Sequence, residues 1–132
     1  MKVLTVGVFD LLHFGHVNLF KRAKSYGDYL IVAVQESDVV KKFKPEANLL
    51  FDTDLRIFMV ESIRYVDEVI TYRNVADIVR ITDFDIFAVG PDQCHEGFQN
   101  AIDWCKSNNK QVIVIPRTDG VSSSQLKGYK ND

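Results

Sequence analysis

Five short runs of apolar and β-branched residues recur along the chain, and a segment of helical length separates each run from the next. The runs occupy residues 3–8, 29–34, 66–71, 86–89 and 112–115. Most of them are apolar at every position, which is typical of parallel strands whose two faces are both covered. Consecutive parallel strands need long crossover connections, which are usually helical. The pattern therefore predicts an α/β fold.

Between the runs, apolar residues recur three and four positions apart, as they do on one face of a helix. This spacing predicts four helices, at residues 17–23, 55–63, 75–79 and 98–105. Asn74 is a suitable N-cap for the third helix, and Asn108 with Asn109 is a suitable end for the fourth. Residues 36–54 have no clean period and include Pro45, so we expect a long loop there, with some helix.

We find no internal repeat or linker in the 132 residues, so we expect one domain over residues 1–132. The order of elements predicts a doubly wound, Rossmann-like sheet of five parallel strands, which binds ligands beyond the carboxyl ends of its strands. Three segments rich in polar residues follow predicted strands, at residues 9–16, 90–93 and 117–120. We therefore expect these three loops to converge on one cleft.

Charge and cysteine content exclude several classes of protein. The 16 basic and 18 acidic residues give a net charge of −2, whereas nucleic-acid and membrane-surface binding need a dominant positive field. Cys94 and Cys105 are eleven positions apart and have no metal-ligand spacing, so we interpret both as reduced thiols. We find neither a signal peptide nor a transmembrane segment, and we expect a cytoplasmic protein without nucleic-acid or membrane partners.

Two histidines, His13 and His16, are three positions apart where the first helix is expected to begin. At this spacing they project from nearly the same face, and the free N–H groups of the helix start point toward the same space. Such a place favours a phosphate group, and imidazole N–H groups add donors to charge that develops during a reaction. The alternative is a pair of capping or core histidines, with Gly15 allowing close contact between helix and sheet. The pair and its position favour the phosphate site.

Three segments resemble motifs of a known family. Residues 7–16, GVFDLLHFGH, are similar to the GxFDxxHxGH signature of the HxGH nucleotidyltransferase superfamily. Residues 117–124, RTDGVSSS, are similar to the RTxGISTT signature of its cytidylyltransferase branch, and residues 63–70, IRYVDEVI, match a further segment of that group. The resemblance extends over essentially the whole chain and is close to glycerol-3-phosphate cytidylyltransferases.

The resemblance implies that a phosphate oxygen of a small phosphorylated alcohol or polyol attacks the α-phosphorus of CTP in line, and that pyrophosphate leaves. Glycerol 3-phosphate is the best single acceptor, ahead of other polyol phosphates and ethanolamine phosphate. No covalent intermediate is expected, so the protein supplies positioning and charge stabilisation. Mg²⁺ or another divalent cation is expected with CTP. Adenylyl transfer from ATP and a non-catalytic nucleotide-binding subunit are the alternatives.

The resemblance also implies roles for individual residues. The expected catalytic residues are His13, His16, Lys44 and Arg117. The expected nucleotide-binding residues are Gly7, Val8, Phe9, Asp10, His13, Gly15, His16, Gly90, Asp92, Arg117, Thr118, Gly120, Val121, Ser122 and Ser123. Acceptor binding is expected from Lys44, Arg56, Gln93 and His95. Lys41 and Lys42 are alternatives to Lys44, and Asp10 is expected to orient a histidine or to hold Mg²⁺.

The chain departs from the resemblance after the fourth predicted strand. Residues 90–98 read GPDQCHEGF where glycerol-3-phosphate enzymes have a GDDWxGK-like loop, so the lysine of that loop is missing. We therefore expect residues 92–98, together with Arg56, to select the acceptor, and this departure leaves acceptors other than glycerol 3-phosphate open.

The segment from Arg64 to Ile70 mixes apolar and charged residues around a short predicted strand. An internal strand with solvated charges is one explanation. The resemblance to dimeric cytidylyltransferases favours a homodimer contact instead, in which Arg64 of one chain meets Asp67 or Glu68 of the other across a two-fold axis.

Overall fold

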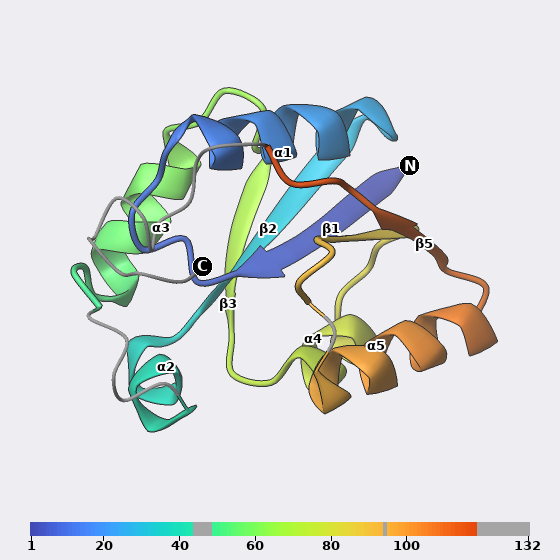
Figure 1. Cartoon of the computed structure of the whole chain (residues 1–132). Coiled ribbons are helices and arrows are strands. Elements are labelled where there is room, and N and C mark those ends of the chain that lie inside the picture. Colours follow the sequence, from blue (N-terminus) through green and yellow to red (C-terminus); the bar gives the residue numbers. More distant parts are fainter. Residues whose placement is uncertain (44–48, 94, 119–132) are drawn as a thin grey trace.

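Five parallel strands form one sheet in the order β3-β2-β1-β4-β5. The computed structural model describes residues 1–43, 49–93 and 95–118 (Figure 1). The strands are β1 (Lys2–Gly7), β2 (Tyr29–Gln35), β3 (Glu68–Tyr72), β4 (Ile86–Val89) and β5 (Gln111–Val114). Each lies within two residues of a run predicted from the sequence. The predicted α/β class and the doubly wound parallel sheet are confirmed.

The four predicted helices are present, and a fifth, short helix is added. The helices are α1 (Phe14–Ser25), α2 (Ser37–Phe43), α3 (Thr53–Glu61), α4 (Val75–Ile81) and α5 (Glu96–Ser107). Asn74 caps α4 as expected, since its side chain accepts the N–H of Ala76 at 2.8 Å. Asn108 ends α5, and Asn109 follows with a φ of 63°. Helix α2 begins the segment that was expected to be mainly loop.

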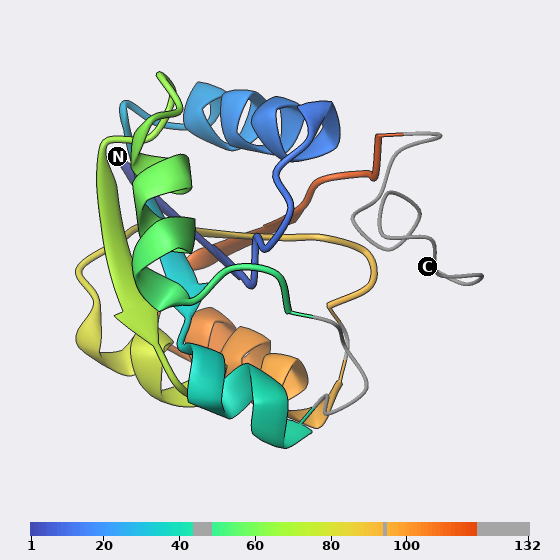
Figure 2. The same ribbon diagram turned by 90° about the vertical axis from the view of Figure 1, so that its left-hand side faces the viewer.

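The two faces of the sheet are both buried, which explains why the strands are apolar throughout. Along β1, Val3 packs in one core cluster with Phe20 of α1 and Val60 of α3. Leu4 packs in the other cluster with residues of α4 and α5. Figures 1 and 2 show α1 and α3 on one face of the sheet and α4 and α5 on the other.

The strand order reverses between β1 and β4, and the two strands separate there toward their carboxyl ends. Residue pairing between them covers Val3 with Ile86 and Leu4 with Phe87, whereas β1 pairs with β2 as far as Gly7. Doubly wound sheets bind their ligands at such a switch point. The loops after β1 and β4 therefore begin at the place where a ligand is expected.

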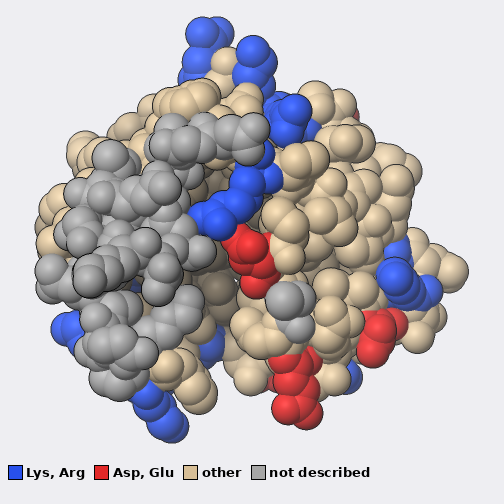
Figure 3. Space-filling view, viewed as in Figure 1, with Lys and Arg blue, Asp and Glu red and all other residues tan. Residues whose placement is uncertain are grey.

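Basic and acidic side chains are interspersed on the face shown in Figure 3, in keeping with the net charge of −2. Among the residues that the structure describes, no helix is both long enough and apolar enough to span a bilayer.

Candidate active site

His13 is the N-cap residue of α1, with an extended backbone at φ −141° and ψ 178°. Its Nδ1 accepts the backbone N–H of Gly15 at 3.1 Å. Because Nδ1 is the acceptor, the imidazole proton lies on Nε2, which leaves an N–H to donate to a ligand. Burial and the nearby positive charge of Arg117 lower the pKa of His13, so this ring is neutral at pH 7. The structure shows that His13 caps α1, and the cap leaves Nε2 free of this contact, so the predicted phosphate contact stays compatible with it.

His16 stacks on His13, with ring centroids 4.0 Å apart and planes 24° from parallel. Burial, and to a lesser degree His13, lowers the pKa of His16 to about 3. Its Nδ1 is buried and has no hydrogen-bond partner among the residues that the structure describes. The two histidines thus form a pair of neutral imidazoles. The pair lies at the start of α1, which is the position that the sequence predicts.

The low pKa of His16 predicts a loss of stability in acid. The unfolded chain takes up a proton on this ring near pH 6.5, whereas the folded protein does so only near pH 3. Between these values the unfolded state binds more protons, so the free energy of unfolding falls by about 1.4 kcal/mol per pH unit as the pH decreases. We expect urea unfolding of His16→Asn to depend less on pH than that of the wild type between pH 6 and pH 4.5. Replacing the exposed His95 by asparagine is the control, and equal slopes in wild type and His16→Asn would contradict the prediction.

Phe9 also packs against His16. Its backbone lies in the left-handed region, with a φ of 52°, which is strained for a residue with a side chain. The buried Phe9 ring meets His16 edge-on at a centroid distance of 5.4 Å. A Cβ on Gly7 would lie only 2.7 Å from this ring, so glycine is required for the ring to fold back over the strand.

The loops after β1, β4 and β5 meet beside the histidines. Arg117 Nη1 lies 3.0 Å from Asp92 Oδ2, which joins the last two loops. Asn18 on α1 donates to Thr118 Oγ1 at 3.0 Å, which brings the loop after β5 to the first helix. Convergence of the three loops, expected from the sequence, is therefore found, and Asn18 is a residue of this junction that no sequence motif indicated.

Asp10 is buried, and both of its carboxylate oxygens accept backbone N–H groups. Oδ2 accepts from Leu50 at 2.7 Å, and Oδ1 accepts from Phe51 at 2.8 Å. These bonds anchor the segment that precedes α3 to the loop that precedes α1. Among the described residues there is no group of three or more His, Cys, Asp and Glu placed to hold a metal ion. Asp10 thus anchors this segment, and its expected role in orienting a histidine or holding Mg²⁺ stays a prediction.

Arg56 is fully buried, at 0% exposure, and does not face an open acceptor site. Its guanidinium donates to backbone carbonyls and to the hydroxyl of Ser37. This placement differs from the sequence-based expectation that Arg56 binds the acceptor. The amphipathic pattern indicated that residue 56 lies on the helix. It did not indicate that the side chain is buried, because long polar side chains are exposed on most helices.

Gln93 and His95 also make contacts within the chain. The Gln93 side chain accepts the N–H of Gly90 at 3.0 Å and donates to the carbonyl of Val6 at 2.9 Å, so it bridges β1 and β4 where they separate. The exposed His95 caps α5 and accepts the N–H of Gly97 at 3.2 Å, which repeats the arrangement of His13 and Gly15. Acceptor binding by Gln93 and His95 stays a prediction.

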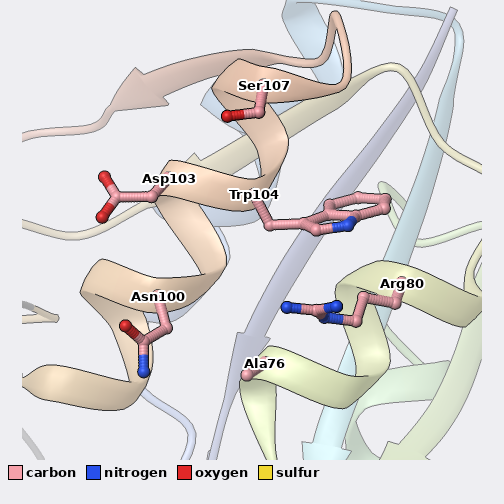
Figure 4. Close-up of a pocket in the computed structure, with 6 residues that line it drawn as sticks. All are labelled: Ala76, Arg80, Asn100, Asp103, Trp104 and Ser107. Atoms are coloured by element: carbon pink, nitrogen blue, oxygen red, sulfur yellow. The ribbon is translucent and has the colours of Figure 1, made fainter.

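Several predicted site residues lie outside the described part of the chain: Lys44, Gly120, Val121, Ser122 and Ser123. Lys41 and Lys42 are exposed in the last turn of α2. A separate surface pocket of about 340 Å³ lies between α4 and α5 and includes the side chains of Arg80 and Trp104 (Figure 4). None of the predicted site residues lines it.

Comparison with known proteins identifies the family of the chain. The model of the cytidylyltransferase-like family matches residues 4–128. A glycerol-3-phosphate cytidylyltransferase of Bacillus subtilis is 36% identical over 130 residues, which cover 96% of this chain and 94% of the relative. An FAD synthase of Thermococcus kodakarensis is 41% identical over 133 residues, which cover 96% of this chain and 89% of the relative.

The fold also matches a solved structure. The lipopolysaccharide core biosynthesis protein of Thermoplasma volcanium superposes with a TM-score of 0.76 at 25% identity, over 90% of this chain and 98% of that one. The histidine pair at the start of α1, the switch point beside it and a family match over nearly the whole length agree with one another. The chain belongs to the cytidylyltransferase-like family and is a nucleotidyltransferase.

Proposed function

We propose that the protein transfers a cytidylyl group from CTP to a small phosphorylated alcohol or polyol and releases pyrophosphate. The observation that supports this most is the stacked pair of neutral imidazoles at the start of α1, next to Arg117 and Thr118. Neutral imidazoles donate N–H bonds without titrating near pH 7, and a helix start adds backbone N–H groups for a phosphate. The glycerol-3-phosphate cytidylyltransferases are relatives over nearly the whole chain.

In this reaction an oxygen of the acceptor phosphate forms a bond to the α-phosphorus of CTP, and the bond to the β-phosphate oxygen breaks. The acceptor phosphate is already anionic at neutral pH, so no general base is needed. The Nε2–H of His13 and the imidazole of His16 stabilise the negative charge that develops on the phosphorus oxygens, and Arg117 adds a positive charge. A divalent cation such as Mg²⁺, bound together with CTP, would neutralise part of the charge of the triphosphate.

The identity of the nucleotide is tested by measuring pyrophosphate release. We expect kcat/KM for CTP to exceed that for ATP by at least about tenfold, because a pocket that hydrogen-bonds a pyrimidine excludes the larger purine. Each nucleotide is assayed with glycerol 3-phosphate, other polyol phosphates, ethanolamine phosphate and FMN. Equal values for CTP and ATP with the best acceptor would contradict the assignment of CTP.

Adenylyl transfer from ATP is the second candidate, and the similarity to FAD synthases favours it. FAD is FMN that carries an adenylyl group, so an enzyme that makes it from FMN transfers that group to a phosphate monoester. The same assay separates the two candidates, since release of pyrophosphate from ATP with FMN, and not from CTP, would select the second. No release with any pair would favour a non-catalytic nucleotide-binding subunit.

We further propose a homodimer that covers the segment from Arg64 to Ile70. Strand β3 is an edge of the sheet and needs a cover against unspecific pairing. Helix α3 packs against β3 and exposes three large apolar side chains at helical spacing, Leu55, Phe58 and Met59.

Within one chain the two carboxylates of this segment already have partners. Asp67 lies 2.6 Å from Lys24 Nζ, and Glu68 accepts from Tyr29 at 2.8 Å. The exposed Arg64 lies over the ring of Tyr65 at 5.8 Å. Asp67 and Glu68 are therefore already held in place within the chain. In a dimer they would present ordered carboxylates to Arg64 of the other chain.

We expect sedimentation at micromolar concentration to give a dimer. We expect Arg64→Glu to weaken this dimer by at least about tenfold, because the new carboxylate of one chain would repel Asp67 and Glu68 of the other. Arg80→Glu on α4 is the matched control, since it makes the same charge change on the other face of the sheet. A fully active monomer of 15.1 kDa would contradict the dimer. A dimer that Arg64→Glu leaves intact would contradict this location of the contact.

A further inference from the structure

The buried guanidinium of Arg56 bonds to four neutral oxygens. Nη1 donates to the carbonyls of Val8 at 2.9 Å and Gln35 at 2.7 Å. Nε donates to the carbonyl of Phe51 at 3.0 Å, and Nη2 donates to the hydroxyl of Ser37 at 2.8 Å. Burial lowers the pKa of Arg56, and the negative charges of nearby acids oppose that shift. The planar fork of the guanidinium is thus used to connect segments of the backbone.

These four oxygens belong to the segments that surround the site. The last residue pair of β1 and β2 is Gly7 with Val34. The next residues are Val8 after Gly7 and Gln35 after Val34. Their carbonyl oxygens both accept hydrogen bonds from Nη1 of Arg56. Beyond the end of a strand pair, a carbonyl oxygen has no hydrogen-bond partner in the sheet. A donor placed there therefore fixes the direction in which the backbone continues.

The Val8 carbonyl connects this junction to the histidines. It belongs to the peptide group that enters Phe9, the residue with a φ of 52°. A strained backbone of this kind persists only where its surroundings hold it. The Phe9 ring in turn lies edge-on to His16, and His16 stacks on His13. A continuous set of contacts therefore runs from Arg56 to the two imidazoles.

We propose that Arg56 is a positioning residue, which holds His16 and His13 in place through the Val8 carbonyl and the left-handed backbone of Phe9. The inference rests on the proposed function for its catalytic consequence, because the histidines act on the transferred phosphate. The effect of Arg56 on the positions of the two histidines is expected in the protein without substrate as well. Arg56 itself contacts no substrate in this assignment.

The kinetic test is Arg56→Lys, which keeps the charge but replaces a planar fork by a single nitrogen that is unable to reach all four oxygens. We expect kcat to fall about 10- to 30-fold, since small misplacements of reacting groups are costly, while KM for CTP changes less than about threefold. Arg80→Lys makes the same change at the exposed end of α4 and is expected to leave both constants unchanged. A kcat for Arg56→Lys equal to that of the wild type overturns the proposal.

A second readout requires no substrate. The chain contains three histidines, so the ring resonances of each are assigned by NMR with single His→Asn variants. In the free protein we expect Arg56→Lys to shift the ring resonances of His16 and His13, because the Phe9 ring beside them moves. The resonances of His95, on a different loop, stay in place. A variant that is only less stable contains a smaller fraction of folded protein, but the resonances of that folded protein do not move. Unshifted resonances of His16 and His13 would therefore overturn the proposal.

Two further variants keep the test decisive if Arg56→Lys does not fold. Ser37→Ala removes one of the four bonds and is expected to shift the His16 resonances in the same direction by less. Phe9→Leu leaves Arg56 bonded and removes the ring beside His16, and it is expected to lower kcat by itself. If the junction that Arg56 makes acts through Phe9, adding Ser37→Ala to Phe9→Leu lowers kcat little further. Fully multiplicative losses, or unshifted resonances in Ser37→Ala, overturn the proposal.

The two readouts also separate this inference from the proposed function. A wild-type protein that releases no pyrophosphate, but whose His16 resonances move in Arg56→Lys, refutes the proposed function and supports the positioning role. An active wild type whose Arg56→Lys variant keeps both kcat and the resonances refutes the positioning role and supports the function.

Discussion

Replacing His16 by alanine is expected to lower kcat by about 10²–10³-fold, the usual cost of losing one preorganised donor to transition-state charge. The imidazole is held before substrate arrives, since it stacks on His13 at 4.0 Å and meets the edge of Phe9 at 5.4 Å. Its pKa of about 3 keeps it neutral over the working range, so the loss reflects a missing hydrogen-bond donor and is expected to be similar from pH 6 to pH 8. Pyrophosphate release under saturating CTP and acceptor measures it.

His16→Ala also removes a partly buried ring that packs against His13 and Phe9, so folding must be checked in the same experiment. His16→Phe is the matched variant, because it keeps an aromatic ring in the stack and lacks the nitrogens. Both variants are expected to show a cooperative urea transition and the far-UV circular dichroism of the wild type. Turnover near the wild-type level in either folded variant would refute the role of His16.

The second large effect is expected from Gly15→Ala, with a loss of about 100-fold in kcat. A Cβ at this position would lie 2.8 Å from His13 Cε1 and 2.9 Å from His13 Nδ1, so the imidazole has to move away from the N–H that it accepts. Alanine is the better helix former by up to about 1 kcal/mol, so the substitution does not weaken α1 through helix propensity. The predicted loss is therefore one of geometry at His13.

Gly97→Ala is the matched control for Gly15→Ala. His95 and Gly97 repeat the same cap at α5, and a Cβ on Gly97 would lie 3.1 Å from His95 Cε1. Both variants disturb a histidine cap, so both are expected to change the free energy of unfolding by about 1 kcal/mol or less. At saturating acceptor we expect kcat to fall sharply only in Gly15→Ala. Equal losses in both variants would show that the effect belongs to the cap and not to the site.

The local features of this protein were determined by the sequence alone. Buried strands require apolar residues at every position, and each of the five runs became a strand of the sheet. A helix start depends on residues within one turn, so Asn74 and the histidine pair were found where they were expected. The same local character makes the family motifs readable, and the family assignment was confirmed by the comparisons.

The contacts between distant segments were decided only by the tertiary structure. Val8 and Arg56 are 48 positions apart, and Asp10 and Phe51 are 41 positions apart. The positive φ of Phe9 has no local cause either, because phenylalanine disfavours that backbone unless neighbouring groups hold it.

The resemblance implied that Arg56 faces the acceptor. It lies buried instead, because three backbone carbonyls and the Ser37 hydroxyl meet at one point of the folded chain and accept its N–H groups. A sequence pattern reports which side of an element is apolar. It is only after the strands and helices have packed together that some backbone groups are left without a hydrogen-bond partner. Those groups determine where the Arg56 side chain lies.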